Sequence, residues 1–297
     1  MNKNSITFII YFSLFLIFSC THPKNAPKII PLQLNVSILL DLSDRVDLKL
    51  HPFQVQIDTE NIETIISLFK KQQSDVGVYD AKGKMKIFFY PPPSNSNIIS
   101  IAKKLNIDFN KVDSTSMVGV SEKIKLFQIL DTLFMSNVRK LYQYSSKNNE
   151  YPGADIFAFF KDEIEDQCIE SNSYYRNILV IITDGYIFWN KDLLNPIGNR
   201  FTYITAKTPQ VTKFRKMEDW ISNFNKEDYG FVNVNKNLPN LEVLVLGIDP
   251  VQVEDFDIIK KYWEKWFLEM KIQPANIKII KTELPVKTNI IEKFFSK

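Results

Sequence analysis

Glycine, histidine and cysteine are scarce in this chain of 297 residues, with 8, 2 and 2 copies respectively. The histidines are His22 and His51, so a Ser-His-Asp or Cys-His enzyme would have to rely on His51 alone, because His22 precedes the predicted domain. A glycine-rich phosphate loop, a CxxC pair and an HExxH motif are all absent from the sequence. The chain therefore gives no sequence indication of nucleotide, dithiol or zinc-protease chemistry.

An excess of charge of one sign is also missing. The sequence has 37 Lys and Arg residues against 34 Asp and Glu residues, a formal net charge of +3. This balance indicates neither a nucleic-acid-binding surface nor a polyacidic tail. Hydrophobic residues make up 45% of the chain, which is typical of a folded protein of one large domain or two small ones.

The amino terminus has the order of a secretory signal peptide. Lys3 precedes the apolar run ITFIIYFSLFLIF at residues 6–18, and a small residue and a cysteine follow. The run is too short to span a bilayer comfortably, and its length fits the apolar core of a signal peptide. We therefore predict that residues 1–19 are a signal peptide.

The residues around Cys20 resemble the lipobox of bacterial lipoproteins. Ile17, Ser19 and Cys20 match that pattern, while Phe18 is bulkier than the family usually has there. The resemblance implies a lipid on Cys20 and a tether over residues 20–33. Because the residue after Cys20 is not aspartate, it also implies a lipid-anchored protein of the cell envelope, at the outer membrane facing the periplasm.

Lipidation of Cys20 would leave Cys168 as the only other thiol. Cys168 would then have no partner for an intramolecular disulfide bond. The pattern around it is that of an apolar helix, so we expect Cys168 to be a buried core residue.

Apolar runs that read as strands alternate with helical patterns along the rest of the chain. VSILLDL and NILVIITDG are continuous apolar runs that stop at Asp41 and Asp184, as buried parallel strands do. The other predicted strands are 84–90, 241–248 and 276–282, and the predicted helices are 59–73, 121–145, 154–168 and 255–270, with a short helix at the carboxyl terminus. This alternation predicts an α/β fold, a doubly wound, mostly parallel sheet with helices on both faces.

Three motifs together resemble the von Willebrand factor A-type domain. They are DLS after the first strand, GAD at residues 153–155 and VIITDG at the fourth strand. The resemblance implies one domain over residues 34–297, with insertions near 91–150 and 186–240. It also implies a metal-ion-dependent adhesion site, in which Asp41, Ser43 and Asp184 match the family's ligands.

Two positions depart from the family's metal site. Arg45 stands where the family has a second serine, and Ala154 stands where it has a threonine, so two oxygen ligands are lost. Asp44 and Asp155 are nearby acids that could compensate, although capping of a turn or helix is the better interpretation of both. We expect weak or absent binding of Mg²⁺ or Mn²⁺, with the guanidinium of Arg45 paired bidentately to Asp41 or Asp184 in place of the metal.

In this family the site binds a protein ligand and catalyses nothing, so the resemblance implies an adhesion-type module whose protein partner the sequence does not identify. Four rings of the second insertion, Trp220, Phe224, Tyr229 and Phe231, could contact a partner, but packing of the insertion is the better interpretation for most of them. The alternative is a haloacid dehalogenase-like phosphotransferase with Asp41 as nucleophile. That family has its second acid two residues later, where this chain has Ser43.

Overall fold

The computed structural model describes residues 31–112, 114–148, 153–189 and 196–297 of the chain. The predicted signal peptide, Cys20 and most of the predicted tether lie outside these residues. No helix among them is both long and apolar enough to cross a membrane. Residues Leu32–Lys297 form one compact unit, which is the part described below.

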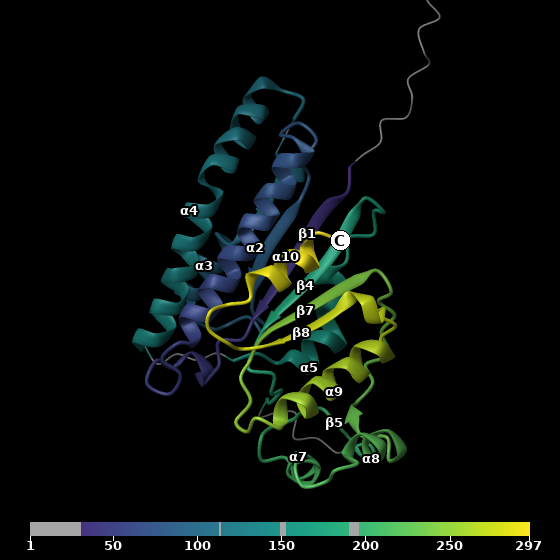
Figure 1. Ribbon diagram of the computed structural model, residues 1–297. Coiled ribbons are helices and arrows are strands. Elements are labelled where there is room, and N and C mark those ends of the chain that lie inside the picture. Colours follow the sequence, from purple (N-terminus) through teal and green to yellow (C-terminus); the bar gives the residue numbers. More distant parts are fainter. Residues whose placement is uncertain (1–30, 113, 149–152, 190–195) are drawn as a thin grey trace, which may run out of the picture. The chain divides into compact units, whose positions relative to one another are not determined.

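A six-stranded sheet lies between two layers of helices (Figure 1). Its strand order is β3-β2-β1-β4-β7-β8, and only β3 is antiparallel to its neighbour. The strands are β1 (Gln33–Leu40), β2 (Lys84–Phe88), β3 (Asn106–Asp108), β4 (Tyr175–Ile182), β7 (Leu241–Ile248) and β8 (Ile277–Lys281). This architecture confirms the predicted α/β fold with a doubly wound, mostly parallel sheet.

The central strands are buried along nearly their whole length. All eight residues of β1 are buried, and the six residues Asn177–Ile182 of β4 are buried as well. Alternate residues enter two separate hydrophobic clusters, because successive side chains of a strand point to opposite faces. Val180 of β4 belongs to the first cluster and its neighbour Ile181 to the second. The continuous apolar runs in the sequence therefore reflect burial on both faces.

Helices from both halves of the chain cover one face of the sheet. They are α2 (Gln54–Val76), α3 (Ser96–Lys103), α4 (Met117–Asn148) and α10 (Thr288–Phe295). The long helices α2 and α4 lie side by side, and α10 packs against α2 (Figure 1). The first cluster joins Ile62 and Phe134 of these helices to Phe294 near the carboxyl terminus. The 3₁₀ turns η2 (Asp44–Val46), η3 (Phe109–Lys111) and η5 (Pro274–Asn276) connect elements of the unit.

The other face is covered by α9 (Asp255–Glu269) and by a helical segment that we predicted as one helix over 154–168. The segment consists instead of α5 (Ile156–Ala158), a π-helical turn η4 (Phe159–Glu163) and α6 (Ile164–Cys168). Phe159 and Phe160 of this turn are both buried. Cys168 is buried, as expected.

The second predicted insertion, residues 186–240, contains β5 (Arg200–Phe201), α7 (Pro209–Phe214), α8 (Trp220–Lys226) and β6 (Gly230–Phe231). The rings of Phe224 and Phe231 lie 5.0 and 5.4 Å from the ring of Tyr262 on α9, measured between centroids. Both rings are buried, as is Tyr229, while Trp220 packs partly buried against the second cluster. These aromatic residues therefore pack the insertion against α9 and the second cluster.

Candidate functional site

The chain reverses the order of its strands between β1 and β4. From β1 it winds outward to β2, whereas from β4 it winds the opposite way to β7. In open α/β sheets such a switch point leaves a crevice outside the carboxyl ends of the two strands, and ligands bind there. Asp41 directly follows β1 and Asp184 follows β4 by two residues, so both acids lie at this crevice.

The carboxylate of Asp41 is held between the two strand ends. Its Oδ1 accepts a hydrogen bond from the backbone N–H of Ser43 at 2.9 Å, and its Oδ2 accepts one from the hydroxyl of Thr183 at 3.1 Å. Only 5% of Asp41 is exposed. The predicted residues Asp41 and Ser43 are thus brought together. Thr183 was missed, although it stands in the TDG turn next to a predicted ligand.

The carboxylate of Asp184 has a raised affinity for a proton. Burial, followed by the negative charge of Asp41, raises its pKa from 3.8 to about 7, while the charge of Arg45 opposes the shift. Burial also raises the pKa of Asp41, against the charge of Arg45 and the hydrogen bonds from Ser43 and Thr183. The two acids are therefore close enough to repel each other, and a proton or another cation relieves that repulsion.

Arg45 does not pair bidentately with Asp41 or Asp184, so that prediction is wrong. Its guanidinium is bidentate to Asp58 of α2, at 2.7 and 3.0 Å, and it reaches Asp41 only through the backbone oxygen, at 3.3 Å. The reason is the turn η2, which directs Arg45 inward to α2, where only 3% of the residue is exposed. Its charge still lowers the pKa of both acids from this position.

The site around Arg45 is closely packed. Asp58 also accepts hydrogen bonds from Gln54 at 2.8 Å and from the hydroxyl of Tyr142 at 2.9 Å. Gly247 lies against the guanidinium with φ of +86°, and a Cβ there would come within 3.0 Å of Nη2 of Arg45. Because α2, α4 and β7 all contribute, this network connects the loop after β1 to three other elements.

The two auxiliary acids differ in position. Asp44 is exposed on η2, and its charge contributes to the raised pKa of Asp184. Asp155 is buried and caps α5 by accepting the N–H of Ala158 at 2.9 Å, which agrees with the capping interpretation. Its segment lies beside the Asp41 loop, because the N–H of Gly153 donates to the backbone oxygen of Leu42 at 3.2 Å.

The oxygen donors at the crevice do not make up a complete magnesium site. Of the positions that match the family's ligands, Asp41, Ser43 and Asp184 offer oxygen atoms, while Arg45 and Ala154 offer none. Within the described ranges, no three His, Cys, Asp or Glu residues are grouped so that they could hold a metal ion. Mg²⁺ prefers six oxygens in a near-octahedral set, and a proton on Asp184 would compete with it. The residues present therefore do not fit a tightly bound divalent ion.

Exposed apolar side chains occur on the loops at the edge of the sheet where the two acids lie. Six occur on the loops that follow β1, β4 and β7, at the same edge of the sheet as the crevice: Leu48, Leu50, Phe53, Phe188, Val251 and Val253. The first and third loops also meet, because Nδ1 of His51 lies 3.6 Å from a carboxylate oxygen of Asp249. Sequence reasoning missed these residues, because an apolar residue in a loop gives no indication of whether it is buried.

Comparison with known proteins gives a distant structural similarity. No protein-family model and no curated protein matches the sequence. Two crystal structures of the pilus adhesin SpaC from Lactobacillus rhamnosus GG are similar, one with a TM-score of 0.39 and 9% identity and the open conformation with 0.35 and 10%. They match 91% and 90% of this chain but only 30% of the adhesin. Similarity at this level carries no argument about function, which has to come from the site itself.

The Arg45–Asp58 pair gives a prediction about stability. Asp58→Ala should reduce the free energy of unfolding by about 3–5 kcal/mol, because it leaves the buried guanidinium without a counter-charge. Urea denaturation measures this loss. As a control, Glu264→Ala breaks a half-exposed pair with Lys260 and should change stability by less than about 1 kcal/mol.

Replacing both partners distinguishes loss of charge from loss of packing. The double variant Arg45→Met and Asp58→Leu buries no charge and should be more stable than Asp58→Ala alone. If Asp58→Ala unfolds at the same urea concentration as the natural protein, the Arg45–Asp58 pair does not stabilise the loop after β1.

The raised pKa of Asp184 predicts a dependence of stability on pH. Below about pH 4 the residue is protonated in both the folded and the unfolded chain. Between about pH 4 and pH 7 only the unfolded chain releases the proton, so this residue makes the protein less stable as pH rises, and above pH 7 its effect is constant. Asp184→Asn should remove this loss and be more stable than the natural protein at pH 8.

Urea denaturation at pH 5 and pH 8 tests this expectation. Asp219→Asn, a substitution at an exposed residue before α8, is the control and should follow the natural profile. Equal stability of the natural protein and Asp184→Asn at pH 8 would show that burial and the charge of Asp41 do not raise the pKa of Asp184.

Proposed function

We propose that this chain is a protein-binding module of the von Willebrand factor A type with a degenerate metal site, held at the cell envelope by a lipid on Cys20. Its binding surface is the edge of the sheet that carries Asp41 and Asp184. The strand order and the acids at the switch point support this assignment of the surface.

One observation carries the proposal: large apolar side chains are exposed on the loops around the two acids. Phe53 is 59% exposed, Val251 67% and Val253 75%, on loops that follow β1 and β7. Apolar residues that surround a polar centre are typical of surfaces that bind other proteins, where buried apolar contacts contribute affinity and charged groups contribute specificity.

The acids give this surface a preference for a cation. One oxygen of Asp184 accepts the N–H of Tyr186 at 2.9 Å, and the other accepts no hydrogen bond from the described residues. Asp44 adds an exposed negative charge nearby. In a site short of metal ligands, a lysine or arginine of the partner can supply the positive charge that a divalent ion supplies in the complete site.

The phosphotransferase alternative gains no support from the contacts. Asp44, the second acid nearest to the position which that mechanism requires, is exposed on η2. Both oxygens of Asp41 accept hydrogen bonds, from Ser43 and Thr183. We therefore retain the binding function as the conclusion.

The degenerate site predicts how the protein responds to metal. In titration calorimetry the natural chain should bind Mg²⁺ and Mn²⁺ no more tightly than about 1 mM. Ala154→Thr restores one oxygen and should tighten binding by about tenfold, and Asp184→Asn should abolish it. Arg45→Ser is unsuitable here, because Arg45 also holds Asp58 in the core. Micromolar binding by the natural chain, unchanged in Ala154→Thr, would contradict the degenerate site.

Crosslinking in the native membrane tests the binding surface. A photo-crosslinking amino acid in place of Phe53 or Val253 should give a discrete crosslinked product, because both positions lie at the proposed surface. The control is Tyr79, which is 67% exposed and lies between α2 and β2, at the opposite edge of the sheet.

A second comparison connects the crosslink to the acids. The product at Phe53 should decrease when Asp184 is replaced by Asn, because the charge at the centre is then lost. If Tyr79 gives as much crosslinked product as Phe53, the support for a partner at the carboxyl ends of the strands is lost.

A further inference from the structure

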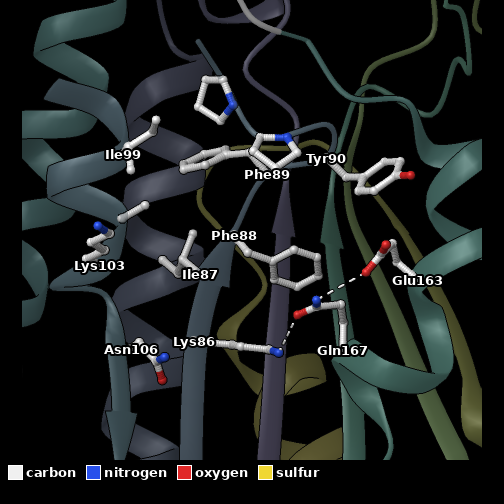
Figure 2. A pocket seen from close by; sticks show the side chains of 13 residues that line it. Lys86, Ile87, Phe88, Phe89, Tyr90, Ile99, Lys103, Asn106, Glu163 and Gln167 are labelled. Atoms are coloured by element: carbon white, nitrogen blue, oxygen red, sulfur yellow. Dashed lines mark hydrogen bonds between the residues drawn. The ribbon is translucent and has the colours of Figure 1, made fainter. Parts of the chain in front are cut away.

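A cavity of about 410 Å³ lies at the outer edge of the sheet, where β2 ends. Side chains of β2 line it from both faces of the sheet (Figure 2). Ile87 and Phe89 lie on the side of Ile99 from α3, whereas Lys86 and Phe88 lie on the side of Gln167 from α6. The candidate site residues Asp41 and Asp184 are not part of its lining. The volume is within the range of about 300–1,000 Å³ that is common for ligand pockets.

The cavity exists because the pairing of β2 with β3 stops early. β3 pairs only with Lys84–Lys86, and the next contact is the N–H of Ile87, which donates to the oxygen of Leu105 at 2.9 Å. The N–H of Leu105 does not return this bond, since it donates to the oxygen of Ala102 in the last turn of α3. Beyond Ile87, the side of β2 that faces β3 is therefore an open strand edge among the described residues.

Phe89 has backbone groups that face this open edge. Phe89 directly follows β2. In an extended chain the N–H and C=O of residues two apart point to the same side, so we infer that those of Phe89 point the same way as those of Ile87. Phe89 is only 6% exposed, and neither its N–H nor its C=O has a hydrogen-bond partner among the described residues. Buried backbone groups without partners are rare, and a donor and an acceptor side by side are what an added strand pairs with.

The lining of the cavity carries the positive charges of Lys86 and Lys103 and the negative charge of Glu163, which accepts a hydrogen bond from Nε2 of Gln167 at 3.3 Å. Lys86 is the group that favours an acidic side chain in a ligand. The ammonium of Lys86 is half-buried, donates to the neutral Oε1 of Gln167 at 2.8 Å and forms no ion pair within the described ranges. The nearby Glu170 is already paired with Lys84. Lys103 adds a second positive charge at the opening. A partly buried ammonium that has only a neutral acceptor would gain from a carboxylate.

The two sides of the cavity therefore favour different side chains in a bound ligand. The side of α3 presents Ile87, Ile99 and Ala102, all apolar, and Ile99 is 36% exposed. The other side presents the ammonium of Lys86 beside the ring of Phe88, at 5.4 Å from the ring centroid. Because side chains of a strand alternate between faces, a segment with alternating apolar and acidic residues matches both sides.

We propose that the edge of β2 binds a short extended peptide segment of a partner protein by strand addition, with alternating apolar and acidic residues. The backbone of the segment pairs with the N–H and C=O of Phe89. Its apolar side chains pack against Ile99 and Ala102, and an acidic side chain pairs with Lys86. This site does not depend on the function proposed for the surface that carries Asp41 and Asp184.

A defined peptide tests the proposal on the full-length chain in detergent. The probe is a fluorescently labelled acetyl-Val-Glu-Val-Glu-Val-amide, and its anisotropy measures binding. It should bind more tightly than about 1 mM. Replacing both glutamates by lysines, or methylating the backbone nitrogens, should weaken binding by at least about tenfold, because the first removes the charge pair and the second the strand pairing.

Variants of the protein locate the site. Lys86→Gln should weaken binding by about tenfold, and Ala102→Trp, which fills the cavity, should abolish it. The matched control is Lys278→Gln, at an exposed lysine on β8, the other edge strand of the sheet, and it should bind as the natural chain does. Thermal unfolding establishes that each variant is folded, and Lys86→Gln remains decisive if Ala102→Trp does not fold. Hydrogen exchange at the amide of Phe89 should slow on peptide binding.

Four results would overturn the proposal. The first is no binding of the peptide up to about 1 mM. The second is binding that Lys86→Gln and Ala102→Trp leave unchanged. The third is binding of dodecanoate in the cavity without binding of the peptide, which would indicate a site for a small anionic amphiphile. The fourth is a dimer in sedimentation that Ala102→Trp dissociates, which would indicate a second copy of the chain at this edge.

Discussion

The buried ion pair between Arg45 and Asp58 connects the candidate site to the rest of the fold. A guanidinium in the interior is stable only with a well-placed counter-charge and further hydrogen bonds. Asp58 supplies the charge at 2.7 Å, and Gln54 and Tyr142 complete the coordination of its carboxylate. The loop after β1 is thereby attached to α2 and α4, while Asp41 itself is held at the end of β4 by Ile182 and Thr183.

The Arg45–Asp58 pair also affects how much negative charge remains on Asp41 and Asp184. Because Arg45 is paired with Asp58, its charge only partly offsets the effects of burial and of the Asp41 charge, which raise the pKa of Asp184 to about 7. The site is therefore left with more negative charge than it can neutralise internally near neutral pH. Exposed apolar side chains occur on loops at the same edge of the sheet as this negative charge, and the proposed binding of a positively charged group of a partner rests on this combination.

The order of strands gives the molecule two places where a partner could bind, for different reasons. At the switch point between β1 and β4, the connections leave in opposite directions, and the loops that follow these strands expose apolar side chains. At β2, the three-residue antiparallel strand β3 pairs only with Lys84–Lys86, and the N–H and C=O of Phe89 have no hydrogen-bond partner among the described residues. The first place offers charge and apolar side chains, and the second offers backbone hydrogen bonds.

The sequence by itself determined the features that depend on local patterns. The apolar runs that end at Asp41 and Asp184 predicted two buried strands with acids at their carboxyl ends, and the alternation with helices predicted the doubly wound sheet. Contacts across the fold depended on the tertiary structure, such as Asp58 for Arg45 and the Thr183 hydroxyl for Asp41. So did the exposure of Phe53 and the lack of a backbone partner for Phe89 among the described residues. Periodicity reports which side of an element is buried, whereas the partner of a side chain depends on how elements distant in the sequence cross.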